Sequence, residues 1–582
     1  MSTRIVVGQG SCGLAAGAGA VYSALEEKIT SASLSITGCI GICYLEPIVD
    51  VYAEDGKLYR CVQVKPEHAE TIVNAAESGN FELLKDLVIK EGDAQFLSKQ
   101  TRIALRHCGI INPDEIDAYM ADDGYQALEK VLKTMTPEQV IEEIKISGLG
   151  GRGGAGFPTW FKWNAARQSP GEEKYLICNA DEGDPGAFMD RAVIESDPHN
   201  LIEGMLIGVY AIGAKEAIVY VRAEYPLAIV RLQNAIKQAE AKGILGENIM
   251  GTGFSCKMRI KAGAGAFVCG EETALIESLE GSRGMPRLKP PFPAQAGYWY
   301  KPSNINNVET FANIAWIINN GGAAFSAMGT ENSKGTKVFA VTGKVNRSGL
   351  VEIPMGKTLR DVIFDIAGGI RGGHEFKAVQ LGGPSGGCIP AHLLDTVIDY
   401  RALGATGAIM GSGGMVVMDE TTCMVGIAKF FLEFTTRESC GKCVHCRIGT
   451  KRLSEILERI VKGEGKEGDI ELLEELCVSI KDGALCGLGQ TAPNPVLTTI
   501  RYFRNEYEAH IRDKKCPAKE CPALLTYSID AEKCIGCSLC AKKCPVGAIT
   551  GELKKTYAID PSVCIRCGQC IHSCRKGAVV VE

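Results

Sequence analysis

The chain has no apolar run approaching the roughly 20 residues that a membrane-crossing helix needs, which excludes a transmembrane helix. Residues 1–10 lack the charged start and the long apolar middle of a signal peptide. The 63 basic and 69 acidic residues leave a net charge of −6, which favours neither nucleic acid nor an anionic membrane as a partner. The sequence therefore predicts a cytoplasmic protein.

A cytoplasmic location also makes disulfides unexpected, although the 582 residues include 25 cysteines. In a reducing compartment cysteines are more often metal ligands than disulfide partners. Hydrophobic residues at 46% and charged residues at 23% are ordinary for globular proteins, and the length indicates about three to five domains. The spacing of the cysteines is therefore the first guide to function.

Two nearly identical cysteine strings lie near the end of the chain. The first is followed by a proline, whereas the second is followed by Arg575. Their spacing, C-x2-C-x2-C-x3-C, is that of a two-cluster bacterial ferredoxin, in which each string gives its last cysteine to the other cluster. Zinc knuckles are the weaker alternative, because zinc sites usually pair C-x2-C units across a longer gap. The predicted [4Fe-4S] ligands are Cys534, Cys537, Cys540 and Cys574 for one cluster, and Cys564, Cys567, Cys570 and Cys544 for the other.

A third cysteine string lies in residues 438–447 (ESCGKCVHCR) and is followed by Cys486 about forty residues later. A C-x2-C-x2-C unit with one distant cysteine is typical of a [4Fe-4S] cluster, and zinc is again the alternative. Lys442 and Arg447 would stabilise the reduced, more negative cluster. The predicted ligands are Cys440, Cys443, Cys446 and Cys486.

Three further candidate ligands lie between this string and the ferredoxin-like tail: His510, Cys516 and Cys521. We expect a structural zinc at a hinge, with Cys477 as an unconvincing fourth ligand; the alternative is that both cysteines are free thiols in a linker. The cysteines without a partner at ligand spacing are predicted to be small core residues: Cys108, Cys178, Cys256, Cys388 and Cys423.

Glycine-rich strings fill the middle of the chain. Residues 148–158 (GLGGRGGAGFP) would be weak evidence alone, although glycines let the backbone approach a phosphate or a ring closely. Four more strings follow in order: 179–186 (NADEGDPG), 263–273 (GAGAFVCGEET), 287–293 (RLKPPFP) and 304–309 (NINNVE). Together these five resemble the flavin-bearing subunit of respiratory complex I and its soluble relatives, over about residues 125–512.

The resemblance implies FMN and a nicotinamide dinucleotide stacked in one cleft, where hydride passes between them and the protein only positions the rings. Glu272 would bond ribose hydroxyls and repel a 2′-phosphate, which favours NADH over NADPH. Trp160, Ala165 and Asp184 depart from the family pattern. The implied FMN residues are Gly151, Gly153, Lys162, Asn179, Asp181, Gly270, Glu271, Asn306 and Asn307, and the implied NADH residues are Phe157, Glu182, Glu272, Lys289 and Phe292.

Residues 1–80 read as a small α/β unit with a strand at Arg4–Val7 and a hairpin turning at Asp55-Gly56. The unit resembles the thioredoxin-like [2Fe-2S] domain of NADH dehydrogenases, whose four cysteines it matches at Cys12, Cys39 and Cys43 only. Gly17 stands at the remaining position, and Cys61 is a doubtful substitute. A [2Fe-2S] domain and a degenerate domain kept for docking therefore stay open as alternatives.

The order of parts predicts a multidomain α/β protein. It resembles the β subunit of cytosolic electron-bifurcating [FeFe]-hydrogenases and of related formate dehydrogenases and transhydrogenases. The expected parts are a thioredoxin-like domain (1–80), a helical connector (81–135), an FMN and NAD(H) domain (136–335), a β-grasp-like domain (336–420), a helical bundle with one [4Fe-4S] cluster (421–512) and a two-cluster ferredoxin domain (513–582).

The resemblance implies a hetero-oligomeric NADH oxidoreductase with three partners: a small thioredoxin-like [2Fe-2S] subunit, a hydrogenase-like catalytic subunit, and ferredoxin. FMN would exchange hydride with NAD(H) and pass single electrons to iron–sulfur clusters. A non-bifurcating NADH dehydrogenase module and an electron-relay scaffold with a dead nucleotide site are the rival interpretations.

Overall fold

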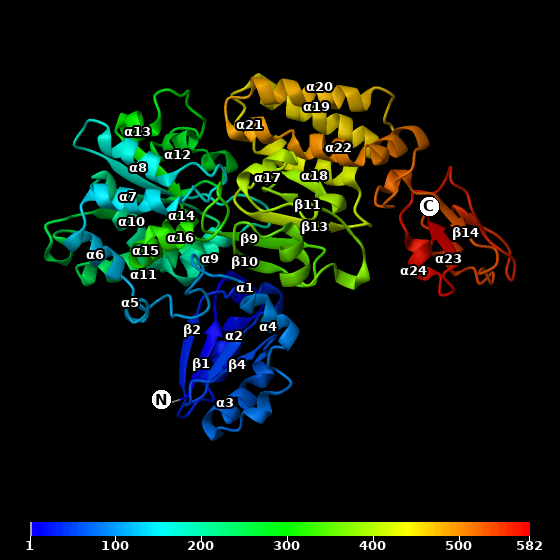
Figure 1. Ribbon diagram of the computed structural model, residues 1–582. Coiled ribbons are helices and arrows are strands. Elements are labelled where there is room, and N and C mark those ends of the chain that lie inside the picture. Colours follow the sequence, from blue (N-terminus) through cyan, green and yellow to red (C-terminus); the bar gives the residue numbers. More distant parts are fainter. Residues whose placement is uncertain (1–2, 582) are drawn as a thin grey trace. The chain divides into compact units, whose positions relative to one another are not determined.

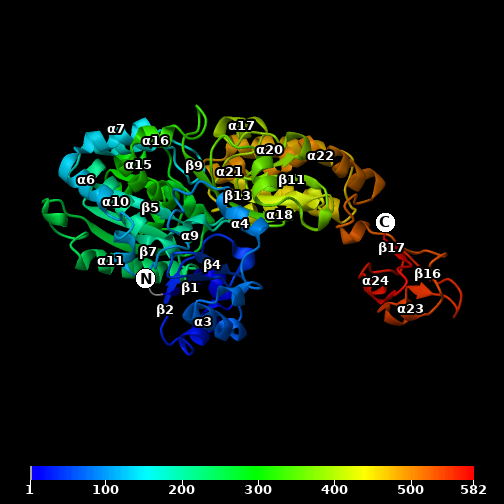
Figure 2. The ribbon, with the colours of Figure 1, turned by 60° about the horizontal axis from the view of Figure 1, so that its bottom comes forward.

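The computed structural model describes residues 3–581, whose elements are shown from two directions in Figures 1 and 2. The chain divides after Val417 into two compact units. The first unit contains an N-terminal mixed sheet, a parallel four-stranded sheet and a five-stranded sheet. Among the described residues, no helix is both long enough and apolar enough to cross a membrane.

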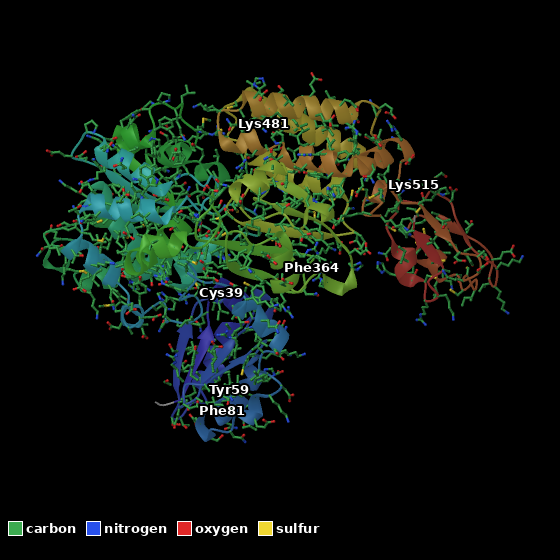
Figure 3. All side chains as sticks on the ribbon, in the orientation of Figure 1. Cys39, Tyr59, Phe81, Phe364, Lys481 and Lys515 are labelled. Atoms are coloured by element: carbon green, nitrogen blue, oxygen red, sulfur yellow. The ribbon has the colours of Figure 1, made fainter. Side chains whose placement is uncertain are left out.

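The N-terminal part folds around one mixed sheet with helices α2 (Ala18–Glu26) and α3 (Ala69–Ser78) packed on it (Figure 1). The expected hairpin is present, and Gly56 at its turn has a φ of 85°, which glycine adopts without strain. Tyr59 stacks on Phe81 with 4.4 Å between ring centroids (Figure 3). The strand order is β2 (Ser33–Thr37), β1 (Arg4–Gly8), β3 (Val49–Tyr52), β4 (Leu58–Cys61).

The connector that follows contributes apolar residues to the next part, in whose core Ile103, Leu105 and Cys108 are buried. A capping box begins the last helix of the connector: Gln139 N donates to Thr136 Oγ1 at 3.3 Å, and Thr136 N donates to Gln139 Oε1 at 2.7 Å. The helices are α4 (Glu91–Ser98), α5 (Ile116–Met120), α6 (Gln126–Thr134) and α7 (Pro137–Ser147).

The central sheet is entirely parallel and is covered by helices. Helix α10 (Pro198–Ile212) is buried along nearly its whole length because it contacts the sheet and also its neighbouring helices, which explains its nearly continuous apolar sequence. The strand order is β7 (Lys257–Gly263), β6 (Glu216–Arg222), β5 (Tyr175–Ala180), β8 (Ser303–Asn307), and the neighbouring helices include α8 (Thr159–Gln168), α11 (Pro226–Ala241) and α15 (Ile314–Asn320).

The third sheet of the first unit is the β-rich insertion that the sequence predicts after residue 336. Its core is a separate apolar cluster, and residues 40–48 of the N-terminal part join it through Ile40, Ile42 and Leu45. The strand order is β10 (Gly349–Pro354), β9 (Thr336–Gly343), β13 (Gly414–Asp419), β11 (Phe376–Leu381), β12 (Gly387–Pro390).

The second unit begins with a bundle of long helices and ends in a small domain with an internal repeat. The bundle consists chiefly of α18 (Met424–Arg437), α19 (Val444–Val461), α20 (Asp469–Gly483) and α22 (Asn494–Glu508). The terminal domain contains two strand pairs and two one-turn helices: β14 (Tyr527–Ile529) with β17 (Val579–Val581), β15 (Ile549–Thr550) with β16 (Ala558–Ile559), α23 (Leu539–Lys543) and α24 (Gln569–Ser573).

Candidate functional site

The carboxyl ends of β5 and β8 meet at the point where the chain changes direction across the parallel sheet. From β5 the chain adds β6 and β7 on one side, and then crosses to place β8 on the other side of β5. Such a switch point is where open parallel sheets bind nucleotides, because the loops that follow the two strands part there. Asn179 lies near the end of β5 and Asp181 directly follows that strand, and Asn306 and Asn307 end β8.

The glycine string 148–158 lies against this edge. A Cβ added to Gly153 would come within 3.1 Å of the Asn307 Cβ, so a larger residue here would require Asn307 to shift. Arg152, which we did not single out from the sequence, fixes the loop. Its buried guanidinium donates to Thr336 O at 3.0 Å, Lys334 O at 2.6 Å and Gly150 O at 2.9 Å. The sequence signal that could have revealed Arg152 is a charged residue inside an otherwise glycine-rich string.

The string 263–273 closes the opposite side of the cradle, since Asn179 Nδ2 donates to Gly270 O at 2.8 Å. Glu271 caps helix α12 (Glu272–Leu279): its Oε2 accepts from Thr273 N and Ala274 N, each at 2.9 Å. The carboxylate that the resemblance assigns to FMN is therefore also used to begin a helix.

Glu272 lies between two lysines. Lys162 Nζ donates to its Oε2 at 3.0 Å, and Lys289 Nζ donates to its Oε1 at 2.7 Å. Burial opposes ionisation of Glu272, but Lys162 and Lys289 overcome that effect and lower its pKa to about 2. The carboxylate is thus held ionised, and the two ammonium groups are brought to the cleft.

Helix α9 (Met189–Ser196) begins at the same edge and is held by Glu182, whose two oxygens accept from Asp190 N and Arg191 N at 3.0 Å each. Asp190 Oδ2 accepts from Asn307 Nδ2 at 2.5 Å. Burial, together with the charges of Glu182 and Glu309, raises the pKa of Asp190 well above its ordinary value. Glu182, implied as a nucleotide contact, is therefore buried as the cap of α9.

Aromatic side chains stand exposed around the mouth of the cradle. Phe157 and Phe292 are 51% and 54% exposed, and Phe157 meets Phe161 edge-to-face with 5.7 Å between ring centroids. Exposed aromatic rings beside a charged cleft are suited to stacking on a purine. The glycine cradle, the lysines and these rings fit a flavin and a dinucleotide.

The cysteines of the third string lie around two helix N-termini. Cys443 is the N-cap of α19, and Cys486 is the N-cap of α21 (Gly487–Thr491). Leu485 N donates to Cys443 Sγ at 3.3 Å, and a Cβ added to Gly489 would lie 3.4 Å from Cys446 Sγ. The fold thus brings the distant Cys486 segment to the C-x2-C-x2-C unit.

The terminal domain brings together the eight cysteines of its two strings as two sets of four. One cavity is lined by Cys534, Cys537, Cys540 and Cys574, and a second by Cys544, Cys564, Cys567 and Cys570. The two halves repeat one another in detail: Cys534 N donates to Asp530 O, and Cys564 N donates to Asp560 O, both at 3.0 Å. Each cavity contains the cysteines of one predicted set.

Comparison with known proteins finds families that match each of these regions of the sequence. Residues 144–316 match the Nuo51 FMN-binding domain, residues 426–510 the NADH-ubiquinone oxidoreductase-F iron-sulfur binding region, and residues 526–578 a 4Fe-4S dicluster domain. NADP-reducing hydrogenase subunit HndC of Solidesulfovibrio fructosivorans is 62% identical over 78% of this chain and 93% of its own length. An NADH-quinone oxidoreductase subunit of Aquifex aeolicus is 48% identical over 68% of this chain and 91% of its own length.

The chain belongs to this family of flavin-binding subunits. It is an NAD(P)H-dependent oxidoreductase subunit, and the family models support FMN and [4Fe-4S] clusters as its cofactors. A solved structure of similar fold, a NAD+-reducing [NiFe]-hydrogenase in the air-oxidised state, has a TM-score of 0.63 and 30% identity, and the match covers 88% of this chain and 85% of that one.

Two of the three residues that depart from the family pattern make specific contacts in the structure. Trp160 packs edge-to-face on Phe161, and Lys145 Nζ lies 5.4 Å from its ring centroid. Asp184 contacts Ser412 Oγ, and a Cβ added to Gly383 would lie within 2.6 Å of the Asp184 carboxyl group. The turn at residues 382–387 therefore packs against the string 179–186. Ala165 lies half-buried on α8.

The three N-terminal cysteines also come together. Cys12 Sγ lies 3.0 Å from Cys39 Sγ, and Cys39 Sγ lies 3.7 Å from Cys43 Sγ. Cys61 is buried in β4 and does not belong to this group. Figure 3 labels Cys39 at the end of the N-terminal part that faces the rest of the first unit, and nearby Thr37 Oγ1 donates to Ile111 O at 2.8 Å.

The remaining ligand group corrects one prediction. Cys423, expected to be a core residue, lies 3.4 Å from His510 Nε2 and 3.6 Å from Cys521 Sγ, and Cys516 completes the group of four. Cys477 is not part of it. Cys423 is 87 residues before His510, so no local spacing connects them; α18 brings its N-cap to the end of α22.

Proposed function

We propose that the protein is the NADH-oxidising flavin subunit of an electron-bifurcating complex. The observation that carries this proposal is the cradle at the β5–β8 switch point, present in one chain with three sets of four cysteines. Bound FMN would exchange hydride with NAD(H) and pass single electrons to the [4Fe-4S] clusters. The names of HndC and of the NAD+-reducing hydrogenase support a hydrogenase-like catalytic partner.

The residues of the chain would bind and orient FMN and the dinucleotide, and would not take part in the reaction themselves. Gly153 brings the backbone close to Asn307, Gly151 packs against the backbone of Phe157, and Asn179 joins the two sides of the cradle. Lys162 and Lys289 offer ammonium groups to phosphate, and Phe157 and Phe292 offer their faces to a purine. No side chain of the cradle is required to move a proton.

The complex would be a cytoplasmic hetero-oligomer that includes a small thioredoxin-like [2Fe-2S] subunit and a hydrogenase-like subunit, and that exchanges electrons with ferredoxin. The same subunit in a formate dehydrogenase or transhydrogenase, and a non-bifurcating NADH dehydrogenase module, are the alternatives. HndC is named as NADP-reducing, whereas Glu272 favours NADH here.

An anaerobic titration tests the core of the proposal. We expect NADH to bleach the flavin absorbance band of the purified holoprotein, and NADPH to do so less efficiently. In the assembled complex, NADH oxidation should then depend on oxidised or reduced ferredoxin. A flavin band that NADH leaves intact contradicts the oxidoreductase proposal, whereas bleaching without ferredoxin dependence contradicts only bifurcation.

We further propose a structural zinc bound by Cys423, His510, Cys516 and Cys521. Three cysteines and one histidine form a closed tetrahedral donor set for zinc. His510 Nδ1 bonds Glu506 O at 2.7 Å, which directs Nε2 at the three sulfurs. The ion would connect the bundle to residues 513–582 at the hinge predicted from the sequence.

A further inference from the structure

The N-terminal cysteine group needs a fourth ligand if it holds a [2Fe-2S] cluster, because each of the two irons takes two protein ligands. Gly17, at the position of the absent cysteine, lies between α1 (Ser11–Ala15) and α2, and a Cβ added there would meet no atom of the described residues within 4 Å. That position is therefore open and provides no ligand atom. The fourth ligand has to come from another part of the chain.

Glu46 is the acidic side chain that reaches the group. It is 9% exposed, and its Oε1 lies 3.6 Å from Cys12 Sγ. Ile48 N donates to its Oε2 at 3.0 Å, which fixes the carboxylate and directs the other oxygen at the cysteine. A Cβ added to Gly13 would lie 3.1 Å from the same Oε2, so glycine leaves the space that this carboxylate occupies.

The distances divide the four groups into two pairs. Two ligands of one tetrahedral metal with bonds of about 2.3 Å lie roughly 3.7 Å apart. Cys39 and Cys43 are 3.7 Å apart, and Cys12 and Glu46 are 3.6 Å apart. The 3.0 Å contact between Cys12 and Cys39 joins the two pairs and would have to open when metal enters.

A buried guanidinium interacts electrostatically with the group. Nε and Nη2 of Arg102 are buried and have no hydrogen-bond partner among the described residues. Burial lowers the pKa of Arg102, while Cys108, Glu352 and Cys39 act against that effect, so the guanidinium lies within electrostatic reach of Cys39. An uncompensated buried cation is costly, and an anionic cluster would offset the cost.

We propose that Glu46 is the fourth ligand of a [2Fe-2S] cluster held by Cys12, Cys39 and Cys43, with Cys39 and Cys43 on one iron and Cys12 and Glu46 on the other. The carboxylate takes the place of the thiolate that Gly17 cannot provide. The site is closed by the rest of the first unit: Ser11 N donates to Glu195 Oε2 at 2.8 Å, and a Cβ added to Gly38 would overlap Ser196.

The test uses the full chain, reconstituted anaerobically with iron and sulfide, and reads the cluster rather than turnover. A reduced [2Fe-2S] centre relaxes slowly enough to be seen by EPR at temperatures where [4Fe-4S] signals have broadened away. We expect such a signal in the wild type, its loss with the matching iron in Cys39→Ser, and a retained signal with shifted g-values in Glu46→Cys, which restores four thiolates.

Glu46→Ala should lose most of the signal, while the matched variant Glu54→Ala, at an exposed turn of the same domain, should keep it. Unchanged FMN and [4Fe-4S] contents show that each variant folds. A wild type without the signal, with zinc in place of iron, or with a Cys12–Cys39 disulfide overturns the proposal. A Glu46→Cys or Glu46→Ala spectrum identical to that of the wild type overturns it as well. None of these outcomes depends on NADH oxidation.

Discussion

Glu272 shows how two neighbours decide the charge of one residue. With its pKa lowered from 4.5 to about 2, the group stays ionised throughout the working range, so it contributes no titration to cofactor choice above about pH 5. Its stabilising effect is fully present above its unfolded pKa of 4.5, and it is lost as the pH falls through about 2.

Replacing Glu272 by glutamine should therefore lower the preference for NADH over NADPH about tenfold, which corresponds to roughly 1.4 kcal/mol. Removing the carboxylate leaves Lys162 and Lys289 free to attract a 2′-phosphate. The measurement is the ratio of kcat/KM for the two cofactors at pH 7 and 9, with Glu240→Gln, an exposed change on α11, as the control. An unchanged ratio in Glu272→Gln would show that the carboxylate has no part in the choice.

Arg102 provides a second prediction at this scale. Arg102→Met should make the N-terminal cluster harder to reduce, lowering its potential on the order of 50 mV, because a buried positive charge no longer offsets the added electron. A redox titration followed by EPR measures the shift, and exposed Lys85→Met serves as the control. A potential equal to that of the wild type would place the guanidinium out of reach of the cluster.

At the scale of elements, the proposed zinc site depends on how α18 and α22 meet. Cys423→Ser should release the zinc and lower the thermal midpoint of the second unit, because metal binding contributes directly to folding. Cys477→Ser is the matched control, since Cys477 is buried in the same bundle but lies outside the group. Elemental analysis that finds full zinc in Cys423→Ser, or its loss in Cys477→Ser, would contradict the assignment.

The internal repeat of the terminal domain makes a distinct prediction about its two strings. If Cys574 serves the cluster of the other string, Cys537→Ser combined with Cys574→Ser loses no more iron than either single change. Combining Cys567→Ser with Cys574→Ser should instead lose both clusters. Iron content and low-temperature EPR distinguish the cases. The opposite pattern would mean that each string holds a cluster by itself.

At the scale of the whole molecule, a buried ion pair joins the parallel sheet to the five-stranded sheet within the first unit. Lys337 Nζ donates to Glu309 Oε2 and, at 2.6 Å, to Ser412 O, and both charged side chains are fully buried. Glu309 also accepts from Val338 N at 2.9 Å. The pair thus fastens α14 (Val308–Ala312), at the end of β8, to β9.

Lys337→Ala should destabilise the first unit by about 3–5 kcal/mol, because Glu309 is left as an unpaired buried charge. Lys337→Met with Glu309→Leu should recover much of that loss. Urea unfolding followed by release of FMN fluorescence measures both variants. Lys133→Ala, which removes an exposed ion pair on α6, should change stability by less than about 1 kcal/mol. A cost in Lys337→Ala no larger than this would contradict the role of the pair.

The cysteine spacing by itself predicted the [4Fe-4S] ligand sets, because short turns convert such local spacing directly into ligand geometry. The flavin site was implied instead by the resemblance of five glycine-rich strings to a known family. The C-x2-C-x2-C units and the hairpin at Gly56 could both be predicted from local patterns. Each depends on residues within a few positions of one another, where the backbone itself sets the distances.

Only the tertiary structure decided the contacts between distant residues. It brought Cys423 to His510, directed Glu46 at Cys12, placed Lys162 and Lys289 on either side of Glu272, and buried Arg152 beneath the glycine loop. The spacing of these residues in the sequence does not predict the contacts, because the packing of whole helices and sheets determines which side chains meet.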